Sequence, residues 1–421
     1  MLFCFEKDFV MNRNEKRVKY ACYVANITMS VVGNLSPVLF LTFRSLYGIS
    51  YSLLGLLVLL NFCTQLGIDL IFSFFSHRFN ISKTVKAIPY ISVVGLFIYG
   101  LFPLFFPQWA YAGLVVGTVI FSAASGLAEV LISPTVAALP SEDPDREMSR
   151  LHSSYAWGVV GVIIFSTLYL LLFGGENWQG LALIFSAIPL LSALLFFKTE
   201  LPKMETPEKA SGALHLLENK GVWISFFAIF FGGAAECTMS QWASGYLEQA
   251  LSIPKVWGDI FGVAMFALFL GLGRSLYGKY GKNIEKVILL CGIGATACYL
   301  VAALSPFPIL GLFACAFTGF ATSMLWPGNL IVAAERFPSG GVFIYALMAA
   351  GGDLGVSVAP QLVGIVTDVA VAHPTVMSLA QTFSLTPEQL GMKLGILVGS
   401  LFPLLGIFVY AYLYKTRKKN L

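Results

Sequence analysis

Long apolar stretches alternate with short polar breaks along nearly the whole chain. A helix needs about 20 apolar residues to cross the hydrocarbon core of a bilayer, and twelve stretches of this kind can be marked out. They lie near residues 20–43, 52–75, 85–106, 110–139, 152–174, 179–197, 221–247, 256–277, 285–304, 308–334, 340–368 and 390–414. The pattern therefore predicts an all-α membrane protein with twelve transmembrane helices.

The longest early polar break, residues 198–220, separates the first six apolar stretches from the last six. We therefore expect an N-terminal six-helix bundle over 20–197, a linker over 198–220 and a C-terminal six-helix bundle over 221–414. A cytoplasmic segment, 1–19, precedes them and a basic cytoplasmic tail, 415–421, follows. In the outer loop 367–389, Thr386-Pro-Glu-Gln389 has the pattern of a capped helix start.

Lysine and arginine fall almost entirely on one side of the predicted spans. If the N-terminus is cytoplasmic, the outer side receives only Arg44, Lys255 and Lys393. Positive residues favour the cytoplasmic side of a membrane, so both termini are expected inside. We expect a multi-pass protein of the plasma membrane, and the polar N-terminus has no pattern of a cleaved signal peptide.

Composition agrees with a membrane protein and argues against several classes of function. Hydrophobic residues make up 57% of the chain and charged residues 11%, with a mean hydropathy of +0.80, which no soluble domain could bury. The net charge of +4 is spread over short loops, so no nucleic-acid partner is expected. The cysteines lack metal spacing, and His77, His152, His215 and His373 are dispersed. We therefore expect no metal site, no cofactor and no enzyme activity.

A motif inside the fourth stretch has a counterpart in the tenth. Gly126-Leu-Ala-Glu-Val-Leu-Ile-Ser-Pro134 and Gly319-Phe-Ala-Thr-Ser-Met-Leu-Trp-Pro327 have the same separation of glycine and proline. This repeat indicates two related halves. Two six-helix halves are typical of a secondary transporter whose site lies between its lobes near the membrane midplane.

Acidic residues within the apolar stretches mark the candidate chemistry. A charge at the centre of a span costs roughly 2.5–3.5 kcal/mol, so each should face protein or water. Glu129, Glu236 and Asp69 are candidates for proton coupling, although a structural pairing is the alternative for each. For Arg274, in the eighth stretch, we expect a structural pairing.

Other polar residues at helical spacing extend the candidate set. Hydroxyls and amides on one face suit hydrogen bonding to a polar solute, although such residues also serve as contacts between helices. The expected solute-binding residues are Asn34, Asn61, Gln65, Ser125, Glu129, Ser133, Glu236, Gln241, Trp242, Thr322, Trp326, Asn329 and Asp353.

Several of these segments resemble the major facilitator superfamily, and within it the fucose–proton symporter family. Gly126-Leu-Ala-Glu129 with Ser133-Pro134 is similar to that family's fourth-helix motif. Leu151-His-Ser-Ser-Tyr-Ala-Trp-Gly158 resembles its fifth-helix opening, and Met324-Leu-Trp-Pro327 its tenth-helix pattern. In the seventh helix, Gly233, Glu236, Trp242 and Tyr246 match. The resemblance implies a solute–proton symporter, often for sugars, with Glu129 in proton or substrate handling. The family's first-helix aspartate is absent here, where Asn26 and Asn34 stand, so coupling through Glu236 or Asp69 is the alternative.

The expected function is therefore secondary active transport of a small polar solute by alternating access, with proton-coupled symport. The expected partners are the solute, a coupling ion (a proton, with sodium as the alternative) and the lipid bilayer, and the protein is expected to be a monomer. An efflux antiporter for amphipathic compounds is one alternative. A non-transporting membrane sensor built on a transporter scaffold is another.

Overall fold

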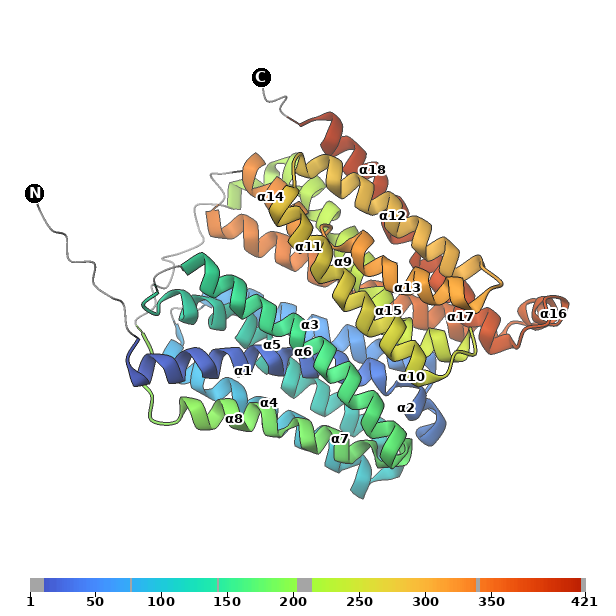
Figure 1. The fold of residues 1–421 in the computed structure, drawn as a ribbon, viewed down its shortest axis with the longest axis horizontal. Coiled ribbons are helices and arrows are strands. Elements are labelled where there is room, and N and C mark those ends of the chain that lie inside the picture. The colour runs from blue at the N-terminus through green and yellow to red at the C-terminus, as the bar shows by residue number, and fades with distance from the viewer. Residues whose placement is uncertain (1–10, 76–77, 142–143, 203–213, 338–340, 418–421) are drawn as a thin grey trace, which may run out of the picture.

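The computed structural model describes residues 11–75, 78–141, 144–202, 214–337 and 341–417. Within these ranges the regular secondary structure is entirely helical. The helices form two groups that lie side by side (Figure 1). We call helices α1–α8 the N-terminal lobe and helices α9–α18 the C-terminal lobe.

The N-terminal lobe contains six predicted stretches. Its elements are α1 (Arg13–Val38), α2 (Phe40–Tyr47), α3 (Tyr51–Phe75), α4 (Ile81–Phe105), η2 (Pro107–Trp109), α5 (Ala110–Ala137), α6 (Pro144–Phe173), η3 (Gly175–Asn177), α7 (Trp178–Phe185) and α8 (Ala187–Phe196). The first stretch is bent by 48° between α1 and α2. Pro37 lies just before this break, as expected of a residue that disrupts helix continuation.

The C-terminal lobe contains the other six. Its elements are η5 (Leu214–Glu218), α9 (Lys220–Gln249), α10 (Lys255–Trp257), the π-helical turn η6 (Gly258–Ala264), α11 (Met265–Tyr280), α12 (Ile284–Leu304), α13 (Pro308–Thr322), α14 (Pro327–Arg336), α15 (Gly341–Ala372), α16 (Pro374–Thr382), α17 (Pro387–Gly399) and α18 (Leu401–Lys415). The predicted cap of α17 is confirmed: Gln389 N–H donates to Thr386 Oγ1 over 3.1 Å, and Thr386 N–H donates back to Gln389 Oε1 over 2.9 Å.

Ten helical segments of the described chain are long and apolar enough to cross a membrane, and the bent pair α1–α2 makes eleven. The predicted stretch 152–174 corresponds to the shorter apolar part of α6, Trp157–Phe173. The all-helical membrane architecture is thus confirmed. The count of twelve and the cytoplasmic position of both termini stay predictions.

The two copies of the glycine–proline motif occupy corresponding places. Gly126 lets α5 approach α3 closely, since a Cβ there would lie 3.0 Å from the Cα of Gln65. Gly319 does the same for α13, since its Cβ would lie 2.1 Å from the Phe266 carbonyl oxygen. The copies differ at the proline. Pro134 lies inside a continuous helix, whereas Pro327 starts a new one after a break at residues 323–326.

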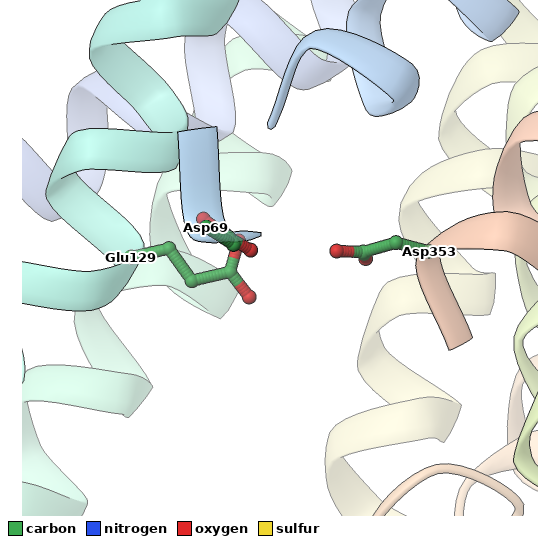
Figure 2. Close-up of side chains that lie close together, drawn as sticks. All are labelled: Asp69, Glu129 and Asp353. Carbon is green, nitrogen blue, oxygen red and sulfur yellow. The ribbon is translucent and has the colours of Figure 1, made fainter. Parts of the chain in front are cut away.

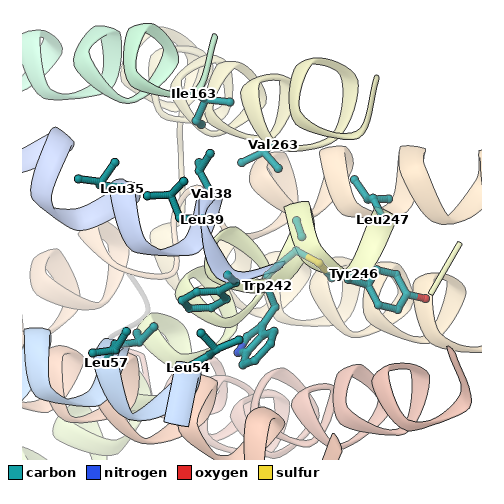
Figure 3. Packing of buried hydrophobic residues seen from close by; sticks show 14 of the residues in the cluster. Leu35, Val38, Leu39, Leu54, Leu57, Ile163, Trp242, Tyr246, Leu247 and Val263 are labelled. Atoms are coloured by element: carbon teal, nitrogen blue, oxygen red, sulfur yellow. The ribbon is translucent and has the colours of Figure 1, made fainter. Parts of the chain in front are cut away.

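The apolar cores show how the lobes meet. One cluster of buried side chains joins both lobes, and Figure 3 shows part of it, with Leu54 of the N-terminal lobe near Trp242 of the C-terminal lobe, and Ile163 near Val263. Its members lie at the helix ends remote from the chain termini. The other clusters each stay within one lobe. The lobes therefore share a core at one end, which we call the closed end. At the other end, the termini end, the clusters of the described residues are separate.

Candidate functional site between the lobes

Asp368 of α15 seals the closed end by capping a helix of the opposite lobe. Its Oδ1 accepts from Tyr51 N–H over 3.0 Å, and its Oδ2 accepts from Ser52 N–H over 2.6 Å. These donors are the unsatisfied N–H groups at the start of α3, where the helix dipole also favours a negative charge. The Arg44 guanidinium lies 4.0 Å from the centre of the Tyr51 ring. The bonds to Asp368 cross from one lobe to the other.

A second polar contact at the closed end joins α6 to η6. The Thr167 hydroxyl donates to Asp259 Oδ2 over 2.7 Å, and Lys255 Nζ lies 3.1 Å from the same oxygen. Lys255 also donates to Ser244 Oγ over 2.8 Å. Asp259 is fully buried. Its carboxylate therefore joins the two lobes and is not solvated.

Two predicted solute-binding residues lie at this seal. Trp242 is 1% exposed, and its Nε1–H donates to the Pro360 carbonyl over 2.9 Å. Its ring packs 5.1 Å from that of Phe40 and 6.2 Å from that of Tyr51, centre to centre. Gln241 Nε2 donates to the Gly33 carbonyl of α1 over 3.3 Å. In this conformation Trp242 therefore packs the lobes together and has no face free for a solute.

Three carboxylates converge on the termini-end side of this seal. Asp69 comes from α3, Glu129 from α5 and Asp353 from α15, and one oxygen of each lies within 4.8 Å of the others. Figure 2 shows Asp69 and Glu129 facing Asp353 across the space between the lobes. Glu129 is exposed although it lies well inside its span. Because it faces Asp353, its exposure is to the space between the lobes and not to lipid.

Glu236 lies elsewhere and is paired. Arg274 Nη2 donates to both of its carboxylate oxygens, over 3.1 and 3.2 Å. Arg274 Nε also donates to the Ser323 carbonyl over 3.1 Å. The prediction that Arg274 makes a structural pairing is confirmed. Glu236 stays a candidate for coupling, but one whose charge is compensated by a partner from its own lobe.

The predicted amides form a network near the middle of the N-terminal lobe. Gln65 Nε2 donates to Asn61 Oδ1 over 3.1 Å, and the Ser122 hydroxyl donates to the same oxygen. Asn61 and Gln241 line one small cavity together with Gly33 and other residues of the N-terminal lobe. Asn34 is bound to its own helix through the Ser30 carbonyl. Amides of both lobes are thus within reach of a common space.

The remaining predicted residues have local partners or lie apart. Ser125 lines a small cavity within the N-terminal lobe, and Ser133 is partly buried. Thr322 donates to the Thr318 carbonyl, and Asn329 donates to those of Ala228 and Leu325. Trp326 packs against Gly233 and Gly352. In this conformation the tenth stretch is therefore mostly occupied in packing.

Sequence reasoning did not single out Asp368 or Thr167, which hold the closed end. It also did not place Asp353 with Asp69 and Glu129. The available signal for Asp368 was its position near the end of a span, where an acid is expected to be solvated unless it has a partner. The partner, the start of α3, lies more than three hundred residues earlier in the chain.

Comparisons with known proteins agree with this architecture. A bacterial homolog of the human lysosomal transporter Spinster, in an inward-facing and unoccupied conformation, aligns with a TM-score of 0.73 at 13% identity, covering 98% of this chain and 100% of that one. A nucleoside transporter aligns at 0.73 and 11% identity over 95% and 99%. The fucose:proton symporter of E. coli aligns at 0.60 and 15% over 95% and 99%. These likenesses concern the fold.

A sequence comparison with curated proteins finds no match. The family model described as Major Facilitator Superfamily matches residues 21–360, which is most of the chain. This match agrees with the resemblance in the fourth, fifth, seventh and tenth apolar stretches, and it places the protein among transporters and not enzymes. The chain belongs to the Major Facilitator Superfamily.

Proposed function

We propose that the protein is a secondary active transporter that moves a small polar solute by alternating access, with proton-coupled symport. The observation that carries the proposal is the carboxylate pair Asp69–Glu129 facing Asp353 across the lobe interface. Three negative charges so close repel one another strongly, and more so where water is scarce. The group therefore needs bound protons or another cation, and its charge state is linked to how close the lobes are.

The amides of both lobes are assigned to the solute. Asn61, Gln65 and Gln241 offer donors and acceptors toward the middle of the molecule, while the carboxylates lie toward the termini end. Neutral amides suit hydroxyl-rich solutes, and solved structures with this fold include those entitled fucose:proton symporter, D-xylose-proton symporter and nucleoside transporter. We therefore assign the solute to sugars and related metabolites.

The contacts at the closed end support rocking of the lobes as the transport motion. There Asp368 and Asp259 hold the lobes together, whereas the apolar clusters at the termini end are separate. With both termini cytoplasmic, this conformation opens toward the cytoplasm of a cell whose plasma membrane holds the protein. An ion gradient supplies the free energy, and no cofactor takes part.

The test is uptake into proteoliposomes under an imposed proton gradient, with a panel of radiolabelled sugars and nucleosides. Glu129→Gln keeps the side-chain shape and removes the charge, so gradient-driven accumulation should fall at least 10-fold while exchange without a gradient persists. Glu176→Gln, an exposed acid on the turn η3, is the matched control and should transport normally.

Other outcomes separate the alternatives. Accumulation unchanged in Glu129→Gln would remove that residue from coupling. Proton release from the vesicles in exchange for an amphipathic compound would favour the efflux antiporter. Absence of counterflow with every solute of the panel would favour a membrane sensor that does not transport.

A further inference from the structure

The three carboxylates carry more negative charge than neighbouring residues compensate. None of the ion pairs among the described residues includes Asp69, Glu129 or Asp353. Glu236, an acid of the seventh span, has Arg274 as its own partner. Elsewhere between the lobes, Asp259 has Lys255, and Asp368 has two backbone donors. The group of three therefore differs from Glu236, Asp259 and Asp368, each of which has a charged partner or a hydrogen-bond donor.

Asp353 provides an independent observation that points to a ligand. Its side chain is 95% buried, with 5% exposed, and its Oδ2 has no hydrogen-bond donor. The side chain points from α15 at Asp69 and Glu129 (Figure 2). Asp69 Oδ1 is also buried without a donor. An unsatisfied buried carboxylate oxygen is costly, so two of them on neighbouring carboxylates indicate a missing positive partner.

We propose that Asp69, Glu129 and Asp353 form a binding site for a hard metal cation that bridges the two lobes. The donor atoms are all carboxylate oxygens. Ca²⁺ and Mg²⁺ prefer such oxygen ligands, whereas softer metals do not. Oxygens bind Ca²⁺ at about 2.3–2.6 Å, so two ligands of one ion lie at most about 5 Å apart. The three carboxylate oxygens lie within 4.8 Å of one another, which fits the size of a Ca²⁺ ion. Mg²⁺, at about 2.0–2.1 Å, requires the oxygens to move closer.

Because the site lies between the lobes, ion binding influences the conformation of the protein. Two ligands belong to the N-terminal lobe and one to the C-terminal lobe, and all lie on the termini side of the shared core. A bound ion ties together parts of the lobes whose apolar clusters are otherwise separate. A ligand stabilises the conformation that binds it, so the ion favours the one in which α15 lies near α3 and α5.

The test is calorimetric titration of the purified, chelator-treated full chain with CaCl₂, MgCl₂ and NaCl, each at constant ionic strength. We expect saturable Ca²⁺ binding at one site and weaker Mg²⁺ binding. Asp353→Asn and Glu129→Gln should each weaken Ca²⁺ binding at least 10-fold, whereas Glu176→Gln should bind like the wild type. The thermal midpoint of unfolding should rise with Ca²⁺ in the wild type and in Glu176→Gln only, which also shows whether each variant is folded.

Na⁺ binding with the same dependence on Asp353 and Glu129 would support the site with a monovalent ion of similar size. Binding of none of these ions, or binding that both substitutions leave unchanged, would overturn the proposal. Binding in detergent needs no solute and no gradient. Its failure would therefore leave the transport proposal standing, with protons as the partner of the three acids.

Discussion

Asp353 and Asp368 lie on the same helix, fifteen residues apart, which is about four turns or roughly 22 Å. Asp368 receives two backbone N–H groups from the start of α3 in the opposite lobe. Asp353 also faces α3, but it meets the carboxylate of Asp69 and leaves its own Oδ2 without a donor. One aspartate of α15 thus has its partners within the protein and the other does not.

We therefore assign Asp368 to holding the lobes together and Asp353 to binding a ligand. A satisfied acid between lobes stabilises the conformation in which its partners meet, and here that is closure at one end. An unsatisfied acid between lobes raises the energy of the same conformation until a cation or proton arrives. The structure combines both along one helix, so the equilibrium between conformations depends on the closed-end contacts and on what binds at the carboxylates.

The largest effect is expected from Gly364→Ala at the closed end. A Cβ at Gly364 would lie 2.4 Å from the Tyr51 carbonyl oxygen of the other lobe, so the helices must separate. Overpacking of this kind costs about 1–3 kcal/mol, which shifts closure by roughly 5-fold to more than 100-fold. Distances between spin labels on Leu46 and Met377, both exposed, should lengthen. Gly161→Ala, where nothing lies within 4 Å, should leave them unchanged.

Asp368→Ala should open the same end to a smaller extent. It removes two hydrogen bonds to a carboxylate, each worth about 1.5–3 kcal/mol where water cannot replace it, but Asp368 is only partly buried. We expect about a 10-fold shift away from closure, read from the same label pair. A distance distribution identical to the wild type would show that Asp368 does not hold the closed end.

The Glu236–Arg274 pair of the C-terminal lobe should contribute to the stability of the fold and not to closure between the lobes. Arg274→Ala leaves Glu236 without its partner, and because the Arg274 side chain is 42% exposed, we expect a loss of only about 1–2 kcal/mol of unfolding free energy. Adding Glu236→Gln should recover part of this loss, since the unpaired charge is then gone. Thermal unfolding of the two single variants and the double variant measures the coupling. Additive effects would contradict a direct pairing.

The smallest effect is expected at the start of α17. Thr386→Ala removes the cap hydrogen bond to Gln389, which is typically worth about 1 kcal/mol. Thr382→Ala, near the C-terminal end of α16, removes a hydroxyl of the same kind without a cap. Hydrogen exchange of the first turn of α17 should increase in the first variant and not in the second.

Features that depend on neighbouring residues could be predicted from the sequence. The Thr386–Gln389 cap and the apolar spans are of this kind, because hydrogen bonds and hydropathy within one segment determine them. The helix break before Pro327 could not be predicted, since Pro134 has the same motif spacing and lies in an unbroken helix.

Features that depend on distant partners needed the structure. Asp69 and Asp353 were each recognised as costly acids in a span, but nothing local indicates that they meet across 284 residues of chain. Glu236 looked as free as Glu129, and only the fold brings Arg274 of α11 to it. The sequence shows which charged residues are costly to bury in a span. Which group compensates each charge depends on the fold.

The central claim is that Glu129 faces water between the lobes and that the closed end seals this water from one side of the membrane. Its most direct test is the labelling of Ser133→Cys, one turn from Glu129 on the same face, in a chain whose native cysteines are replaced by serine. A membrane-impermeant thiol reagent should react from the side of the membrane that carries the termini and not from the other. Labelling from neither side, with the protein folded, would contradict the account.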